Sequence, residues 1–174
     1  MQLLELIKGA ETSDETYNTI AAFGESVLGK GIVHAKDTPN FIGNRIGIYG
    51  MMTAVKLAIK QGLTVEEVDK LTGTISGRPK SATFRTADVV GLDTLKNVTL
   101  TTYEKVIEDE ERDIFNIPDI LNTLVDSNRL GQKTKAGFYK KNEDSSISSV
   151  DLNSGEYKPQ KSVRFDCFRI AKDK

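Results

Sequence analysis

The sequence is poor in the residues that build disulfides and metal sites. Its 174 residues include one cysteine, Cys167, one histidine, His34, and no tryptophan. One cysteine excludes an intramolecular disulfide and a cysteine-rich metal site, and one histidine excludes a histidine-rich metal site. A lone cysteine is typical of proteins that stay in a reducing compartment. We therefore expect a cytoplasmic protein without a metal centre.

Long hydrophobic runs and an excess of charge of one sign are absent as well. No apolar stretch approaches the roughly 18 residues that a membrane-spanning helix needs. Residues 2–7 are mostly apolar, but they contain Glu5 and no basic region precedes them, so they are a poor signal peptide. The 24 lysines and arginines nearly balance the 25 aspartates and glutamates, which argues against binding to nucleic acid or to an anionic membrane. Hydrophobic residues make up 38% of the chain, enough for one core.

Apolar residues recur at helical spacing through most of the first 130 residues. Thr12 and Glu15 have the spacing of a capping box, and Asp37-Thr38-Pro39 is the strongest helix start in the chain. The pattern predicts helices over 12–28, 39–61, 64–71, 81–106 with a break near Gly91, and 117–130. Residues 2–7 and 32–36 are predicted to be short extended stretches. The predicted fold class is therefore all-α.

The composition changes from Lys141 onward. Asparagine, aspartate, serine and glycine dominate the next residues, and the helical periodicity is lost. Residues 158–174 then hold six basic and two acidic residues. We interpret residues 1–140 as one helical domain and residues 141–174 as a short irregular tail, or as a linker to a further domain.

Two features that suggest a site by themselves are better explained without one. Gly29-Lys30-Gly31 has part of the pattern of a dinucleotide-binding turn, but His34 stands where the third glycine belongs, and a predicted helix precedes the turn. His34 itself has no nucleophile or orienting group near it in the sequence, so we interpret it as a surface or packing residue. The residues alone therefore indicate a helical domain that lacks a complete catalytic set.

Five segments together resemble the C-terminal domain of the 3-hydroxyacyl-CoA dehydrogenases, and their order and spacing match that family over residues 1–139. They are MQLLELI at 1–7, DTPNFIGNR at 37–45, GRP at 77–79, DVVGLD at 88–93 and GQKTKAGFY at 131–139. The resemblance implies the all-α fold shared with the C-terminal domain of 6-phosphogluconate dehydrogenase. It also implies the oxidation of L-3-hydroxyacyl-CoA to 3-oxoacyl-CoA with NAD in fatty-acid β-oxidation.

The family pattern contains two parts that this sequence lacks. In the family, an NAD-binding Rossmann domain precedes the helical domain, and the catalytic histidine lies just before the position of Met1. The resemblance therefore implies a fragment that needs the Rossmann domain of the same protein and is inactive alone. The tail after Tyr139 is similar to the connector of longer, multifunctional β-oxidation proteins. Because the family dimerises through this domain, we also expect a homodimer.

The resemblance assigns roles to three residues. Glu5 occupies the position of the glutamate that steadies the catalytic histidine while the histidine takes the hydroxyl proton of the substrate. Asn44 matches an asparagine that donates to the substrate oxygens, and Lys133 matches a lysine that reaches NAD on the other domain. Arg45 is expected to form a structural ion pair or an interface contact. Glu5→Gln is expected to lower kcat and to leave stability nearly unchanged.

Two alternatives stay open. The first is a non-catalytic helical dimerisation module. The second is the helical domain of a related β-hydroxyacid dehydrogenase that acts on small acids. The segments at 37–45 and 131–139 favour the acyl-CoA enzymes over the enzymes of small acids.

Overall fold

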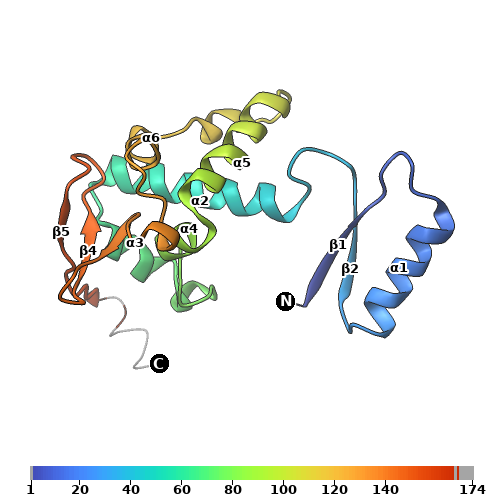
Figure 1. Cartoon of the computed structure of the whole chain (residues 1–174), viewed down its shortest axis with the longest axis horizontal. Helices are drawn as coiled ribbons and strands as arrows, with labels where there is room; N and C mark the ends of the chain where they lie inside the picture. The colour runs from blue at the N-terminus through green and yellow to red at the C-terminus, as the bar shows by residue number, and fades with distance from the viewer. Residues whose placement is uncertain (1, 167, 169–174) are drawn as a thin grey trace.

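The computed structural model describes residues 2–166 and residue 168. The N-terminal elements are β1 (Leu3–Ile7), α1 (Asp14–Ser26) and β2 (Gly31–Ala35). The helices that follow are α2 (Gly43–Gln61), α3 (Val65–Leu71), α4 (Phe84–Val90), α5 (Leu92–Lys105) and α6 (Asp119–Asp126), with short 3₁₀ turns η1 (Thr74–Ser76), η2 (Arg112–Phe115) and η3 (Gln132–Thr134). Figure 1 shows two parts, a β1–α1–β2 unit and a helical body, which one chain segment between β2 and α2 joins.

The β1–α1–β2 unit consists of two parallel strands with the helix as their crossover connection. The register pairs Leu3 with Gly31. Helix α1 approaches the strands closely at Gly24, where a Cβ would lie 2.8 Å from a methyl carbon of Ile32. Gly24 is also the only buried residue within residues 2–36. The predicted extended stretches are thus paired strands, and the unit has almost no core of its own.

Helix α2 begins later than predicted. The sequence places a start signal at Pro39, but the helix begins at Gly43. Asn40 and Phe41 have positive φ values of 63° and 47°, so the chain makes a left-handed turn first. The Asn40 amide donates to the Thr102 hydroxyl of α5 at 2.6 Å, which fixes this turn on the helical body. The predicted helix start at Pro39 is therefore wrong. A long-range contact of Asn40 holds the residues before Gly43 out of helical conformation.

Most other helix ends follow local signals. Thr64 and Glu67 form the predicted capping box at the start of α3. Gly62 ends α2 in the left-handed conformation with a φ of 66°. Gly91 separates α4 from α5, which is the predicted break in the helix. Helix α1 is capped by Ser13, one residue later than predicted. Neighbouring residues thus determine where these helices end.

The helical body has one continuous core to which each of its five α-helices contributes. Side chains that are almost fully shielded from water include Met52, Ala58, Val65, Phe84, Leu92, Leu124 and Phe138. Burying one large apolar side chain stabilises a fold by about 1.5–3 kcal/mol, so these residues account for the stability of the body. The predicted helical fold class is confirmed, with small sheets beside the helices. Within residues 2–166, no helix combines the length and apolar character needed to cross a bilayer.

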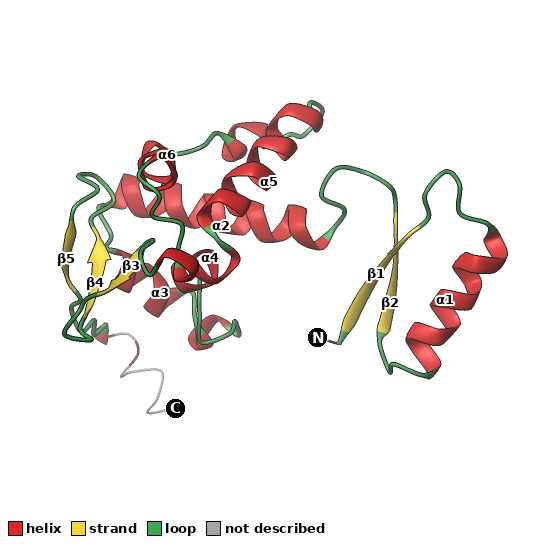
Figure 2. Ribbon diagram, in the orientation of Figure 1, coloured by secondary structure: helices red, strands yellow, loops and turns green. Residues whose placement is uncertain are grey.

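The segment after residue 140 contains regular structure that the sequence did not predict. Strands β3 (Tyr139–Lys141), β4 (Ile147–Val150) and β5 (Tyr157–Pro159) form an antiparallel sheet, far from β1 and β2 (Figure 2). The buried Glu66 carboxylate of α3 accepts from the Ser149 hydroxyl at 2.7 Å and from the Lys161 N–H at 3.1 Å. Part of the predicted irregular tail is therefore sheet, and positions 167 and 169–174 lie outside the described residues. A domain boundary at residue 140 stays a prediction.

Candidate functional site

Glu5 reaches from β1 to the start of helix α2. Its Oε1 accepts a hydrogen bond from the Gly43 N–H at 2.5 Å, and its Oε2 accepts one from the Ile42 N–H at 3.2 Å. The residue that precedes α2 provides no side-chain cap. Glu5 therefore supplies acceptors for N–H groups that a helix start leaves unpaired. The positive end of the helix dipole also favours a carboxylate there, so the charge of Glu5 is fixed in place.

Glycine at position 43 allows this close approach. A Cβ on Gly43 would lie 2.5 Å from the Glu5 Oε1, closer than non-bonded atoms come. At Gly47, one turn further along α2, no heavy atom other than those of its chain neighbours and of the adjacent helix backbone lies within 4 Å of the position of a Cβ. The sequence analysis did not select Gly43, because its role depends on a residue 38 positions away. The start of α2 is thus shaped to receive the carboxylate of Glu5.

Asn44 and Arg45 follow in the first turn of α2 and have different surroundings. The Asn44 side chain is exposed and hydrogen-bonds to no other described residue, so its amide is free to bind a ligand. The Arg45 guanidinium pairs with Asp109, and this hydrogen bond lowers the pKa of the Asp109 carboxyl. The structural ion pair predicted for Arg45 is confirmed. Glu5 and Asn44, both predicted site residues, therefore lie together at the start of α2.

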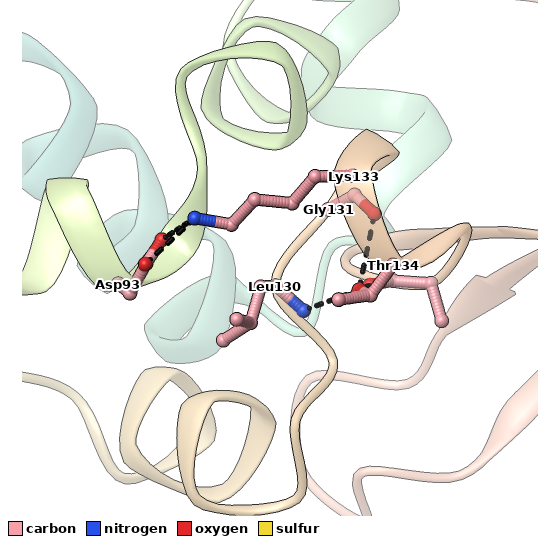
Figure 3. A network of polar contacts seen from close by, with 6 residues as sticks. Asp93, Leu130, Gly131, Lys133 and Thr134 are labelled. Atoms are coloured by element: carbon pink, nitrogen blue, oxygen red, sulfur yellow. Dashed lines mark hydrogen bonds and ion pairs between the residues drawn. The ribbon is translucent and has the colours of Figure 1, made fainter.

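Lys133 lies elsewhere, in η3. Its amine is 2.6 Å from both carboxylate oxygens of Asp93 in the first turn of α5 (Figure 3). The hydrogen bond from Lys133 lowers the pKa of Asp93. The Thr134 hydroxyl closes the same loop by accepting from the Leu130 N–H (Figure 3). In the part of the chain that the structure describes, no hydrogen bond or ion pair joins Lys133 to Glu5 or Asn44.

A buried carboxylate, Asp88, and a partly buried one, Asp69, hold the segment 131–139, and neither was predicted as a site residue. Asp88 accepts from the N–H groups of Phe138 and Tyr139, both at 2.8 Å, and burial raises its pKa to about 6. Asp69 accepts from the Tyr139 hydroxyl at 2.9 Å and from N–H groups at the start of α4. Burial also raises the pKa of Asp69. Asp88 begins the segment 88–93 that carries the family resemblance, but no local pattern indicates the role of either aspartate, because their partners lie far along the chain.

The features that imitate a nucleotide or general-base site have structural explanations. Gly29 and Gly31 lie on the turn from α1 into β2, whereas a dinucleotide-binding turn runs from a strand into a helix. The His34 Nδ1 lies 2.7 Å from the Tyr17 hydroxyl, and the centroids of the two rings are 5.6 Å apart. His34 is therefore an exposed residue that packs on α1. Among the described residues, no three His, Cys, Asp or Glu side chains gather as metal ligands.

Sequence comparison relates the chain to dehydrogenases. The model of the 3-hydroxyacyl-CoA dehydrogenase C-terminal domain matches residues 41–141, more than half of the chain. A Bacillus subtilis protein named "Probable 3-hydroxyacyl-CoA dehydrogenase" is 46% identical over 175 residues, which cover 99% of this chain. The human mitochondrial hydroxyacyl-coenzyme A dehydrogenase is 36% identical over 140 residues, or 80% of this chain.

Solved structures have the same fold. FadB2 of M. tuberculosis has a TM-score of 0.70 and 28% identity, over 80% of this chain and 47% of its own. The (S)-3-hydroxybutyryl-CoA dehydrogenase of Ralstonia eutropha has a TM-score of 0.68 and 29% identity, over 79% of this chain and 46% of its own. The chain spans only 22% of the Bacillus relative and 43% of the human one. The family match over residues 41–141 shows that the chain belongs to the 3-hydroxyacyl-CoA dehydrogenase family and carries its C-terminal domain.

Proposed function

We propose that the chain is the helical, substrate-binding half of an NAD-dependent L-3-hydroxyacyl-CoA dehydrogenase. The complete protein would oxidise a 3-hydroxyacyl-CoA to the 3-oxoacyl-CoA in fatty-acid β-oxidation. One observation carries the proposal: two N–H groups fix Glu5 at the start of α2, next to the free amide of Asn44. A fixed carboxylate beside an amide donor suits a reaction that removes a hydroxyl proton while a carbonyl forms.

Glu5 acts in this proposal as a positioning residue for a histidine base. The histidine would come from a part of the protein outside this chain, as the family resemblance implies. When that base takes the hydroxyl proton it becomes a cation, which the nearby carboxylate stabilises. Each Glu5 oxygen uses one lone pair for a backbone N–H and keeps another free. A bond to the imidazole therefore does not require either existing bond to break.

Asn44 would bind the reacting oxygen of the substrate. As carbon 3 changes from an alcohol to a ketone, its oxygen loses its proton and becomes only an acceptor. A neutral amide N–H donates to that oxygen and does not compete for the proton. The position of Asn44 in the first turn of α2 adds the favourable end of the helix dipole. Its interaction should therefore strengthen as the carbonyl forms.

The residues of this chain fit one contact with NAD and not a whole cofactor site. NAD, when bound, accepts the hydride from carbon 3. The Lys133 side chain is 48% exposed. Its ammonium group has three N–H donors, and the bonds to Asp93 use only part of them, so Lys133 can also bind a cofactor oxygen. The turn at Gly29–Gly31 lacks the geometry of a phosphate-binding loop. We therefore assign most of the NAD site to another domain of the same protein.

The β1–α1–β2 unit is the face that we propose to meet this Rossmann domain. Large apolar side chains of the unit are open to water: Leu3, Ile20, Phe23, Val27 and Leu28. Two parallel strands with one helix do not form a stable sheet by themselves. The relatives are also much longer than this chain, which leaves room for such a domain. We therefore expect the chain alone to bind NAD weakly and to turn over no substrate.

A groove at the start of α2 supports self-association as a homodimer. The groove has a volume of about 310 Å³, and Phe41, Ile46 and Tyr49 supply much of its apolar wall. Ile46 is 67% exposed, and an exposed apolar patch often marks an interface. Closed two-fold symmetry is the commonest arrangement of oligomers. Analytical ultracentrifugation should show a species of two chains, and a strict monomer at high concentration would contradict this part of the proposal.

Steady-state kinetics on the complete protein test the proposed function. Glu5→Gln removes the charge that stabilises the imidazolium, so kcat for a 3-hydroxyacyl-CoA should fall by about two orders of magnitude, or ~3 kcal/mol. KM should change little, because Glu5 is not proposed to touch the substrate. Glu11→Gln is a matched control at an exposed residue between β1 and α1, and it should keep a normal kcat.

The same variant also changes the contact with α2. Glutamine offers one acceptor oxygen, and its NH₂ group would face an N–H of Ile42 or Gly43. We therefore expect some loss of stability, which corrects the sequence-based expectation of nearly unchanged stability. A near-normal kcat in Glu5→Gln would contradict the proposal. Activity of the complete protein on small 3-hydroxy acids alone would favour the related β-hydroxyacid dehydrogenases instead.

A further inference from the structure

A cavity of about 360 Å³ between α4, η3 and the β3–β4 strands is lined by basic side chains. Its walls include Arg85, Lys135, Lys140 and Lys141. None of the four forms an ion pair with another described residue. The whole chain carries a net charge of −1, so this concentration of positive charge is a local feature of the fold.

Backbone pairing places Lys135 next to Lys140 and Lys141. The Lys141 N–H donates to the Lys135 carbonyl at 3.3 Å, and Ala136 and Lys140 form an isolated β-bridge between them. Lys135 has a φ of 60°, a left-handed conformation that lysine seldom adopts. The Lys140 amine lies over the Tyr157 ring, 5.4 Å from its centroid, and like charges on neighbouring residues raise the local potential. An anion bound among them would lower that potential.

The acidic side chain in the wall, Asp88, directs both of its oxygens at backbone N–H groups. It is only 5% exposed. Arg85 lies over the Tyr139 ring, 4.1 Å from its centroid. Stacking occupies a face of the guanidinium and leaves its N–H edge to bind a ligand. The cavity therefore presents cationic donors and no exposed carboxylate among its described lining residues.

We propose that this cavity binds a phosphate-bearing small molecule of the nucleotide class, whose phosphate is held by Arg85 and Lys141. Guanidinium and ammonium groups form strong charge-assisted hydrogen bonds with phosphate oxygens. Val89 and Ile147 add an apolar wall, which suits a ligand that also carries a base. The volume is in the ordinary range of small-molecule sites. None of the lining residues belongs to the proposed dehydrogenase site, and only the choice of CoA and its bisphosphate fragment as probes rests on the proposed function.

Isothermal titration calorimetry on the 174-residue chain tests this site with adenosine 3′,5′-bisphosphate, CoA and inorganic pyrophosphate. The bisphosphate should bind with a Kd below about 1 mM at low salt. Arg85→Gln and Lys141→Gln should each weaken binding by about five-fold or more, since each removes a charge-assisted hydrogen bond. Lys36→Gln makes the same charge change at an exposed lysine outside the cavity and should alter the Kd by less than about two-fold.

The probes distinguish the sources of the phosphate. If CoA and the bisphosphate bind more tightly than pyrophosphate, the site takes a nucleotide, as proposed. If pyrophosphate binds equally well, the nucleotide assignment is overturned in favour of free phosphate. Absence of binding by all probes at about 10 mM, or an equal loss in Lys36→Gln, would overturn the site itself. Lys141→Gln keeps the test valid if Arg85→Gln misfolds, because the Lys141 side chain is exposed and outside the core.

Discussion

The β1–α1–β2 unit and the helical body contain similar side chains but bury them very differently. Met52 and Phe84 in the body are fully shielded from water, whereas Phe23 and Val27 in the unit are 47% and 67% exposed. The body therefore has its own source of stability, and the unit has little. The difference indicates that one continuous chain holds a part with a core of its own and a part with almost none.

Glu5 joins the two parts, so the difference between them matters for the proposed function. Its bonds to Ile42 and Gly43 run from a strand of the unit to the start of α2 in the body. Among the described residues, β1, which carries this carboxylate, pairs with β2 and with no other strand. The proposed catalytic geometry therefore involves the part of the chain that has almost no core of its own.

The largest expected effect is a difference in amide hydrogen exchange between the two parts. In the isolated chain, amides of β1 and β2 should exchange nearly as fast as in an unfolded peptide. Amides in the middle of α2 should be slower by roughly a thousandfold or more, because they open only with the core. Mass spectrometry of exchanged peptides measures both. Equal protection in the two parts would show that the unit is stable by itself. The complete protein is the control, and in it the amides of the unit should become protected.

Local signals predicted the elements whose ends depend on neighbouring residues. The capping box of Thr64 and Glu67 and the left-handed Gly62 act within a few positions, and the structure has both where the sequence predicts them. The roles of Glu5, Asn44 and Lys133 came from the family resemblance instead. Only the three-dimensional structure shows that Glu5 and Asn44 lie together at the start of α2 and that Lys133 lies elsewhere, paired with Asp93.

Features that depend on distant partners were not predictable from periodicity. The start of α2 moved from Pro39 to Gly43, where the acceptor for the first helical N–H is Glu5. Strand β4 in the predicted irregular tail is held by Glu66, which lies 83 positions from Ser149. Hydrophobic spacing does not encode such contacts, because each needs one particular pair of residues to meet after folding.

The second prediction concerns Asp88 and the stability of the body alone. Burial raises the pKa of Asp88 to about 6 from 3.8, so the folded protein keeps a proton that the unfolded chain has lost. Between these pH values the folded state binds more protons, and this contribution to stability falls as pH rises. In Asp88→Asn the titrating group is gone, and this contribution disappears with it. The stability of the wild type relative to the variant should therefore drop by at most ~3 kcal/mol from about pH 4 to about pH 6.5.

Urea denaturation, followed by circular dichroism across this pH range, measures the difference. Asp88→Asn will lower stability in absolute terms, because the amide NH₂ would face the N–H of Phe138 or Tyr139, so the slope with pH is the readout. Asp37→Asn, at an exposed residue, is the control and should leave the slope unchanged. A slope in Asp88→Asn equal to that of the wild type would contradict the account of this carboxylate.

The most direct test of the central claim is to push Glu5 away from α2 without removing its charge. Gly43→Ala does this, because the new Cβ would overlap Oε1 of Glu5, while Gly47→Ala meets no atom within 4 Å beyond its chain neighbours and the adjacent helix backbone. Alanine favours a helix over glycine at either position, so helix propensity predicts no loss. In the complete protein, kcat should fall about tenfold or more in Gly43→Ala, since a small displacement of a positioning group is costly. It should stay near normal in Gly47→Ala, and equal kcat values for the two variants would contradict the claim that Glu5, held at the start of α2, positions the catalytic base.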